Sequence, residues 1–196
     1  MKRALALFGP LAAVLVSSAA RAEAPPPFVK ARRPPFAVQV TALFGDGLRF
    51  NNPYRLATVL GTDAESVSRT AAYVDLGATA LFGDPRGFLH GLAVRTSIAV
   101  EGISQVVFTP SYEIFHRFGP TAAWARVGTP ILLAYAPSWG LEGALGGAIF
   151  VRAGFGVMAE LVFDAMFGTG TRESRITTYP IASAQLGFVF HYEVLP

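Results

Sequence analysis

The chain has 196 residues, of which 52% are hydrophobic and 15% charged, and it contains no cysteine. This composition excludes a disordered chain, and the missing cysteine excludes a disulfide scaffold and any Cys-based metal site. The length fits a single domain. A helix bundle also fits poorly, because glycine and phenylalanine are common while lysine is almost absent.

The first 22 residues are typical of a secretory signal peptide. Met1-Lys2-Arg3 is a short positive segment, residues 4–20 are apolar, and Ala20-Arg21-Ala22 matches an A-x-A cleavage site. The apolar stretch is interrupted by Gly9-Pro10 and is shorter than the ~20 residues of a transmembrane helix. We therefore expect export through the secretory pathway and a mature chain that starts at Glu23, rather than a retained anchor.

Loss of this leader changes the charge balance. Three of the sixteen basic residues, Lys2, Arg3 and Arg21, leave with it, so thirteen remain against thirteen acidic residues. No basic face is left to neutralise phosphates, and we expect no nucleic-acid partner. Residues 23–35 are rich in proline and are predicted to form an extended periplasmic linker.

The rest of the chain alternates in hydrophobicity with a period of two. In residues 155–167 every odd position is apolar, while the even positions include Gly156, Glu160 and Asp164. This alternation indicates a β-strand rather than a helix, and thirteen residues exceed the usual soluble strand of about 5–6. The same pattern predicts eight strands, at residues 36–50, 70–83, 88–102, 105–118, 121–135, 140–152, 155–167 and 178–192.

The connections between these strands differ in length at the two ends. Compact turns are predicted at residues 83–87, 119–120 and 153–154, whereas residues 51–69, 136–139 and 168–177 form the other connections, together with a short turn at 102–104. Short periplasmic turns and longer outer loops are typical of outer-membrane barrels. The predicted fold is all-β: an eight-stranded antiparallel up-and-down transmembrane β-barrel over residues 36–192, followed by a C-terminal tail at 193–196.

The polar face of the strands indicates which way the barrel faces. A soluble barrel exposes a face rich in Lys, Glu and Thr, but here that face is mostly small residues with isolated charges, and Lys30 in the linker is the only lysine after the leader. Aromatic residues also gather near strand ends, as expected for interfacial belts. One predicted belt contains Phe36, Phe82, Phe88, Phe118, Trp124, Phe155 and Tyr192, and the other Phe50, Phe108, Tyr135, Trp139, Phe167 and Tyr179. We therefore favour an apolar face toward lipid over a soluble periplasmic lipocalin-like ligand-binding barrel.

The last predicted strand carries a motif of its own. Residues 185–192, QLGFVFHY, fit the pattern polar-x-Gly-x-x-aromatic-x-aromatic, with Gln185, Gly187, Phe190 and Tyr192 at the defining positions. This motif resembles the assembly signal on the last strand of bacterial outer-membrane barrels. With the strand count and the unequal connections, residues 36–192 resemble the small OmpA-type and OmpX-type outer-membrane barrel superfamily. The resemblance implies a Gram-negative outer membrane as location, with outer-membrane lipid and the barrel-assembly machinery as partners. Members of that superfamily commonly end at the last aromatic residue, whereas this chain continues with residues 193–196.

Three prolines lie within the predicted strands. Pro110, Pro130 and Pro180 all fall in the half of their strands nearer the longer connections. A closed barrel has no edge strand on which a proline is tolerated. We expect bulges at these positions, or segments that extend beyond the ladder.

The predicted hairpin at Gly119-Pro120 fixes a set of neighbours inside the barrel. If these two residues form the turn, Glu113 lies directly opposite Arg126. Pairing of the strands at 88–102 and 105–118 is expected to bring Arg95 close to Glu113, and Glu160 is expected at a similar height, which gives a lumen charge cluster of Arg95, Glu113, Arg126 and Glu160. Such a cluster is a charge-neutral plug or, alternatively, a gate or proton path. We favour the plug, because buried charges need partners and eight strands leave an interior just filled by side chains.

The sequence offers little support for catalysis or for a metal site. Outer-membrane lipid-modifying enzymes are barrels of this size, but they need a His near a Ser or an acid. His90 and His116 are predicted on the lipid face, His191 lies at the turn end, and the chain has no His-x-Ser pair. We expect no enzyme activity, no metal and no cofactor.

Two functional classes remain open from the sequence. One is a structural or surface-interaction barrel whose loops, residues 51–69 and 168–177, meet an extracellular ligand. The other is a narrow pore or a lipid-handling outer-membrane protein. Lumen conductance in a planar bilayer separates the two classes.

Overall fold

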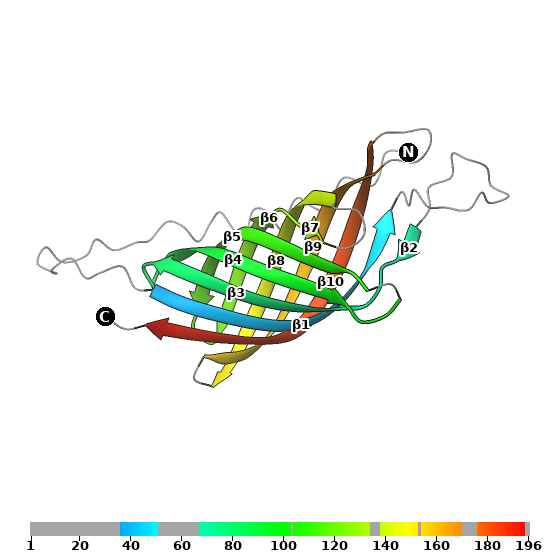
Figure 1. Ribbon diagram of the computed structural model, residues 1–196. Coiled ribbons are helices and arrows are strands. Elements are labelled where there is room, and N and C mark those ends of the chain that lie inside the picture. The colour runs from blue at the N-terminus through cyan, green and yellow to red at the C-terminus, as the bar shows by residue number, and fades with distance from the viewer. Residues whose placement is uncertain are drawn as a thin grey trace, which may run out of the picture. The chain divides into compact units, whose positions relative to one another are not determined.

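The computed structural model describes residues 36–50, 67–102, 104–133, 138–152, 154–169 and 176–194. They form ten strands (Figure 1): β1 (Phe36–Phe50), β2 (Val67–Arg69), β3 (Tyr73–Gly83), β4 (Phe88–Ala99), β5 (Val106–Phe118), β6 (Thr121–Gly128), β7 (Ile131–Leu132), β8 (Ser138–Arg152), β9 (Phe155–Thr169) and β10 (Ile176–Val194). Within these residues no helix is long and apolar enough to cross a membrane. The predicted leader and linker, residues 1–35, lie outside the described part of the chain.

The strands form one closed antiparallel barrel. The eight long strands pair in the order β1, β3, β4, β5, β6, β8, β9 and β10, and β10 pairs back with β1 from Phe36–Val194 to Arg49–Ile181. The short strands β2 and β7 extend the sheet at one end, where β2 pairs with β1 and β7 with β5 and β8. The predicted fold class, an eight-stranded antiparallel up-and-down β-barrel, is confirmed.

The two ends of the barrel are named here by their connections. The turn end carries the hairpins after β3, β5 and β8 and the start of β1, and the loop end is the opposite one. Gly119 in the hairpin after β5 has a φ of +64°, a left-handed conformation that glycine adopts without a steric cost.

The strand boundaries differ from the predicted ones mainly at the loop end. Residues 67–69 form β2 instead of belonging to a loop, β8 begins at Ser138, and residues 168–169 and 176–177 belong to β9 and β10. Of the predicted loop-end connections, residues 51–66, 103, 136–137 and 170–175 lie outside the described residues. At the turn end, β10 continues to Val194, so Glu193 and Val194 belong to the strand and not to a tail.

Of the three prolines predicted to disturb a strand, only Pro130 interrupts one. The strand predicted at 121–135 is divided into β6 and β7 by Thr129-Pro130. Pro130 lacks an N–H group, but its carbonyl accepts from the Gly140 amide at 2.9 Å, and the Thr129 amide donates to Pro110 O at 3.1 Å. Pro110 and Pro180 instead lie inside continuous strands, opposite Val94 and Ala165.

The register of the β5–β6 hairpin agrees with the prediction from Gly119-Pro120. Phe118 pairs with Thr121 and Glu113 with Arg126, and the same register continues beyond Pro130 to Phe108 and Ile131 of β7. The hairpin therefore sets the pairing along the whole of β5, and the interruption at Pro130 does not shift it.

The strands are strongly staggered around the barrel. Directly paired residues lead from Val38 of β1 through all eight long strands and return to β1 at Leu48, ten residues further along. Closing a sheet into a barrel requires such a stagger together with strand tilt. As a result, residues at the same height are not directly paired neighbours.

The outward face of the barrel is apolar. Leu92 and Ile149 on this face are 70% and 62% exposed. Inward-facing positions instead include the buried polar residues Gln39, Thr79 and Glu113. A soluble barrel instead has apolar side chains in its interior and polar side chains on its outer face.

The aromatic residues only partly form the two predicted belts. At the turn end Phe36 lies 5.0 Å from Phe82, and at the loop end Trp139 lies 4.8 Å from Phe167, both between ring centroids. The assignment of Trp124 and Tyr179 to the belts is wrong, because both face the interior and are only 4% and 9% exposed. Tyr135 lies outside the described residues.

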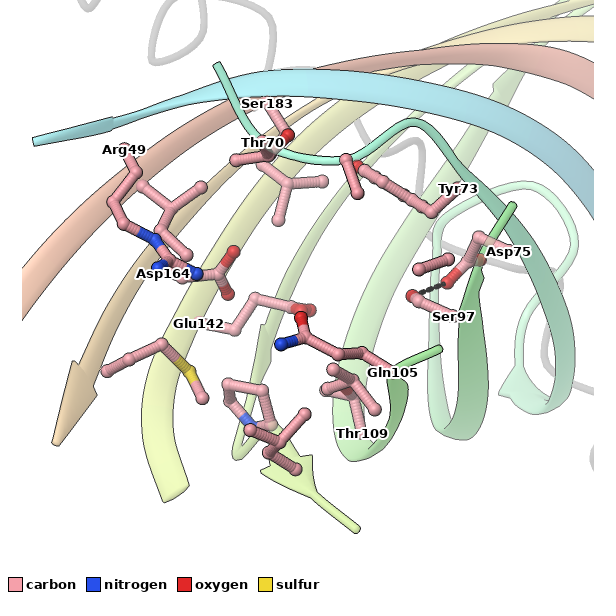
Figure 2. Close-up of a pocket in the computed structure, with 18 of the residues that line it drawn as sticks. Arg49, Thr70, Tyr73, Asp75, Ser97, Gln105, Thr109, Glu142, Asp164 and Ser183 are labelled. Atoms are coloured by element: carbon pink, nitrogen blue, oxygen red, sulfur yellow. Dashed lines mark hydrogen bonds between the residues drawn. The ribbon is translucent and has the colours of Figure 1, made fainter. Parts of the chain in front are cut away.

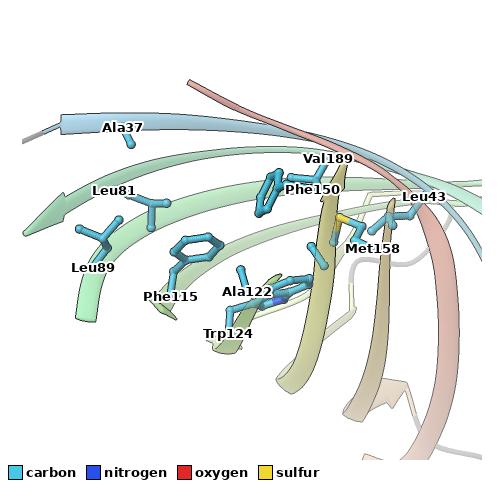
Figure 3. Packing of buried hydrophobic residues seen from close by; sticks show 11 residues of the cluster. Ala37, Leu43, Leu81, Leu89, Phe115, Ala122, Trp124, Phe150, Met158 and Val189 are labelled. Carbon is cyan, nitrogen blue, oxygen red and sulfur yellow. The ribbon is translucent and has the colours of Figure 1, made fainter. Parts of the chain in front are cut away.

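Large apolar side chains fill the turn-end part of the interior. They form one buried cluster (Figure 3) that includes Leu81, Leu89, Phe115, Trp124, Phe150, Met158 and Val189. The central charged residues Arg95, Arg126 and Glu160 lie beyond most of this cluster, toward the loop end, while His191 and Arg117 pack against its aromatic rings at the turn end. The interior therefore has an apolar layer below a charged one.

Candidate functional site in the barrel lumen

A network of buried charges occupies the middle of the lumen. Arg95 of β4 pairs with Asp75 of β3, with Nε donating to Oδ1 at 2.6 Å and Nη2 lying 2.5 Å from the same oxygen. Ser97 donates to the other Asp75 oxygen at 2.6 Å. Arg95 Nη2 also lies 3.8 Å from Glu160 Oε1 on the far wall. This arginine therefore connects one side of the barrel to the other.

Glu160 of β9 is the centre of this network. Its Oε1 accepts from Arg126 Nη2 at 2.5 Å and from Gln185 Nε2 at 3.1 Å, and its Oε2 accepts from the Trp124 indole at 2.8 Å. Arg126 also donates from Nη1 to Glu142 of β8. Hydrogen bonds to a buried carboxylate offset the cost of removing its charge from water.

Glu113 has a different environment from the one predicted. It lies directly opposite Arg126 in the ladder, yet Arg126 binds Glu142 and Glu160 instead. Within the described part of the chain Glu113 has no ion pair; Thr79 donates a hydrogen bond to it, and its Oε1 has no partner. The expected proximity of Arg95 and Glu113 does not follow from pairing either, because Arg95 pairs with Thr109 and Glu113 with Gly91.

The structure thus places Arg95, Glu113, Arg126 and Glu160 together in the interior, all buried. It adds members that the sequence reasoning did not assign to the cluster: Asp75, Trp124, Glu142, Asp164 and Gln185. All five share the inward face with the predicted four, by the alternation of side chains along their strands. Their height in the barrel depends on the stagger between strands. The alternation along one strand gives the face of a residue but not this stagger.

Two glycines make room for this network. Gly77 of β3 lies where an added methyl group would meet the Arg95 side chain, and Gly146 of β8 pairs directly with Trp124. A methyl group on Gly146 would overlap the indole ring of Trp124. Glycine at this position is therefore required for Trp124 to lie flat against the wall and reach Glu160.

A cavity of about 280 Å³ lies on the loop-end side of the charge network (Figure 2). Its lining includes residues of the network, among them Asp75, Arg126, Glu142 and Gln185. Its other lining residues include Tyr73, Thr109, Ser138, Asp164, Ser183 and Tyr179. We name this space the loop-end cavity.

Aromatic and charged side chains occupy the turn end of the lumen. His191 stacks on Phe115 with ring centroids 5.2 Å apart, and the Arg117 guanidinium lies 4.7 Å above the Phe150 ring. Arg117 also pairs with Glu193 at 3.4 Å. A second cavity there measures about 20 Å³, roughly the space of one water molecule.

The histidines do not lie in an arrangement typical of catalysis. His90 Nδ1 lies 2.6 Å from the Tyr112 hydroxyl on the outer face, and His116 Nδ1 lies 2.7 Å from Gly87 O. His191 is buried among aromatic rings, with Nε2 3.7 Å from Glu193. No group of three or more His, Cys, Asp or Glu side chains in the described ranges is arranged to hold a metal ion.

The four residues of the predicted assembly signal face two ways. Gln185 points into the lumen and donates to Glu160. Gly187 lies against β1, where an added methyl group would overlap the Ala42 and Leu43 backbone. Phe190 and Tyr192 are exposed on the outer face. Recognition of these residues by the assembly machinery stays a prediction.

Comparison with known proteins finds solved structures of similar fold, and it assigns the chain to no family. No family model matches the chain, and no curated protein sequence matches it. Among solved structures, the crystal structure of Neisserial surface protein A (NspA) is similar with a TM-score of 0.48 and 11% identity, covering 79% of this chain and 96% of that one. A structure from the de novo design of transmembrane β-barrels is similar with a TM-score of 0.43 and 9% identity, covering 85% of this chain and 100% of that one.

Proposed function

We propose that the chain is an integral outer-membrane β-barrel with a closed lumen and a structural or surface-interaction role. The observation that carries the proposal is the apolar outward face of all eight long strands. Soluble monomeric proteins rarely expose apolar patches larger than a few hundred Å². Here large apolar residues are exposed on every long strand, for example Val40, Leu76, Leu92, Ile114, Val127, Leu145, Leu161 and Leu186. Lipid is the surrounding that stabilises such a surface.

The interior supports a plug over a pore. The apolar layer around Phe115 and Trp124 and the paired charges of Arg95, Arg126 and Glu160 occupy the lumen below the loop-end cavity. Ions crossing this barrel would have to displace both layers. The narrow pore is therefore the second candidate, and a lipid-handling protein the third.

Two features outside the lumen complete the proposal. The A-x-A site at Ala20-Arg21-Ala22 supports removal of a leader and export. Phe190 and Tyr192 of the predicted assembly signal are exposed on the outer face, which supports recognition by an assembly factor. The predicted loops, residues 51–69 and 168–177, are proposed to meet an extracellular ligand, and most of their positions lie outside the described residues.

Membrane fractionation of a Gram-negative cell that expresses the full chain tests the location. We expect the protein in the outer-membrane fraction of a density gradient, with a mass that corresponds to a start at Glu23. Recovery as a soluble periplasmic protein, or an intact Met1 terminus, contradicts the proposal.

Planar-bilayer recording tests the closed lumen separately. The purified barrel is expected to insert without a steady ion current. A reproducible ohmic conductance would instead assign the pore function.

A further inference from the structure

The charges that surround the loop-end cavity do not balance. Five buried or partly buried carboxyl groups lie in the lumen: Asp75, Glu113, Glu142, Glu160 and Asp164. Arg95 and Arg126 lie among them, and Arg49 lines the cavity near the rim. Among the described residues, the lumen therefore contains more acidic than basic side chains.

The excess of acid is concentrated at Glu142 and Asp164. These residues are directly paired across β8 and β9, and both side chains line the cavity (Figure 2). Arg126 donates to Glu142, which leaves Asp164 as the carboxyl group of the pair without an ion pair among the described residues. Asp164 Oδ1 has no partner within the described residues.

Two neutral acceptors in the same cavity are also unsatisfied. Ser138 Oγ and Gln185 Oε1 have no hydrogen-bond partner in the described part of the chain. The two residues are only 7% and 6% exposed, and both line the cavity. A buried polar atom without a partner costs free energy. The Gln185 oxygen only accepts, and the Ser138 hydroxyl accepts or donates, so a ligand that donates hydrogen bonds can satisfy both.

The unsatisfied donors of the cavity are less available. Arg126 Nε has no partner, but the same guanidinium already binds Glu142 and Glu160. Arg49 Nε has none either, and its guanidinium lies 4.9 Å above the Tyr179 ring near the rim. The interior of the cavity therefore favours a donor with a positive charge over an anion.

We propose that the loop-end cavity binds a small organic cation, with an ammonium group held by Asp164 and Glu142. An ammonium group has three N–H donors and no acceptor, which matches the unpartnered oxygen of Asp164 and its paired neighbour Glu142. Ser138 and Gln185 lie four strand positions to either side of this pair and offer further acceptors along the cavity. A volume of about 280 Å³ lies at the lower limit of small-molecule sites, so the ligand is a short aliphatic amine. A metal ion is a poorer match, because the described side chains provide no group of three metal ligands.

Calorimetric titration of the refolded full barrel in detergent tests this proposal. The probes are cadaverine, the neutral 1,5-pentanediol and the zwitterion 5-aminopentanoate, which are similar in length, together with MgCl2. We expect saturable one-to-one binding of cadaverine, and at least tenfold weaker binding of the three other probes. Equal binding of pentanediol or aminopentanoate, binding of Mg²⁺ alone, or no saturable binding of cadaverine overturns the proposal.

Matched variants place the binding in the cavity. Asp164→Asn is expected to weaken cadaverine binding at least tenfold. Glu113→Gln removes the same charge from the lumen outside the cavity lining and is expected to change binding less than twofold. Equal weakening in both variants would indicate a general effect of lumen charge and would overturn the site.

A further variant, Ala99→Leu, tests the location of the binding site without changing Glu142 or Asp164. Ala99→Leu leaves every carboxyl group in place and fills part of the cavity, which Ala99 lines. We expect at least tenfold weaker binding in this variant, and unchanged binding overturns the proposal. Heat-modifiable gel migration shows that each variant is folded, so a loss of binding is separated from a loss of the barrel.

Discussion

Glu160 determines how the charges in the middle of the barrel are arranged. It binds two arginines, an indole and an amide, whereas Glu113 lies opposite Arg126 without pairing with it. Backbone pairing thus places two residues side by side but does not decide which carboxylate a long guanidinium reaches. The stabilisation is expected to follow the side-chain contacts.

Double-mutant cycles at these residues test this assignment. Arg126→Met alone is expected to destabilise the barrel by about 3–5 kcal/mol where water does not reach the lumen, because it leaves buried carboxylates unpaired. Combined with Glu160→Gln, it should show a coupling energy of about 1–3 kcal/mol, since the two groups are in contact. Urea unfolding in lipid vesicles measures both values.

The matched cycle combines Arg126→Met with Glu113→Gln. These residues are ladder neighbours without an ion pair, so we expect a coupling energy smaller than that of Arg126 with Glu160. A larger coupling for Glu113 than for Glu160 would show that the side chains are arranged by the ladder, contrary to the network described.

Gly146 is a second single-residue test. Gly146→Ala places a methyl group in the Trp124 ring, and overpacking of this kind costs about 1–3 kcal/mol. Gly143→Ala on the same strand is the control: a methyl group there meets nothing within 4 Å, and a cost within about 0.5 kcal/mol is expected. Urea unfolding provides the comparison, and equal stability of the two variants would mean that Trp124 does not lie over Gly146.

At the scale of the strand, the alternation of side chains predicts that a charge lowers folding stability most where it faces lipid. Leu161 of β9 lies on the outward face opposite Leu145. Leu161→Arg is expected to reduce folding stability in lipid by about 2–4 kcal/mol, as for a charge at the bilayer midplane. Val67→Arg, in the short strand β2 at the loop end, should cost about 0–1 kcal/mol, as for a charge near an interface. Equal folding yields of the two variants in vesicles would remove the support for the outward face.

Strand positions were predictable because each strand alternates faces over its full length. β1 has the predicted limits, and the hairpin at Gly119-Pro120 gave the correct register of β5 and β6. Both depend on local information: the parity of side chains and the length of one turn. Pro130 also followed its known restriction, since it divides the strand that contains it.

The composition of the lumen was only partly predictable. Trp124 was assigned to a membrane belt although it shares the inward parity of Arg126, because aromatic residues near strand ends usually lie at interfaces. Asp164 was predicted on the polar face and Glu142 was not assigned, and their meeting with Arg126 depends on a ten-residue stagger summed over eight pairings. Some of these pairings join strands connected by long loops, and the length of a long loop does not determine the register of the strands it connects. The loop-end cavity depends on the same stagger.

At the scale of the whole molecule, closure depends on the contact between the first and last strands. β1 and β10 pair along almost the full length of β1, although they lie at opposite ends of the barrel sequence. Ala42 pairs directly with Phe188 across this seam, and Phe188 in turn pairs with Val157 of β9. The seam is therefore open to a direct test by cross-linking.

The chain has no cysteine, so introduced thiols give an unambiguous cross-link. Ala42→Cys with Phe188→Cys is expected to form a disulfide in the folded barrel, which closes a loop of most of the chain and increases its mobility on a non-reducing gel after boiling. Ala42→Cys with Val157→Cys, one strand further away, should remain reduced. Cross-linking of the second pair and not the first would contradict the closed barrel.

Heat-modifiable gel migration of the protein taken from the outer-membrane fraction tests most directly that the chain is a closed barrel in a membrane. Closed barrels with every long strand paired on both sides resist unfolding by detergent at room temperature, so an unboiled sample keeps its compact shape. We predict that the unboiled protein is found in the outer-membrane fraction and migrates differently from the boiled protein. A protein recovered in the soluble periplasmic fraction, with the same migration before and after boiling, would contradict the membrane barrel.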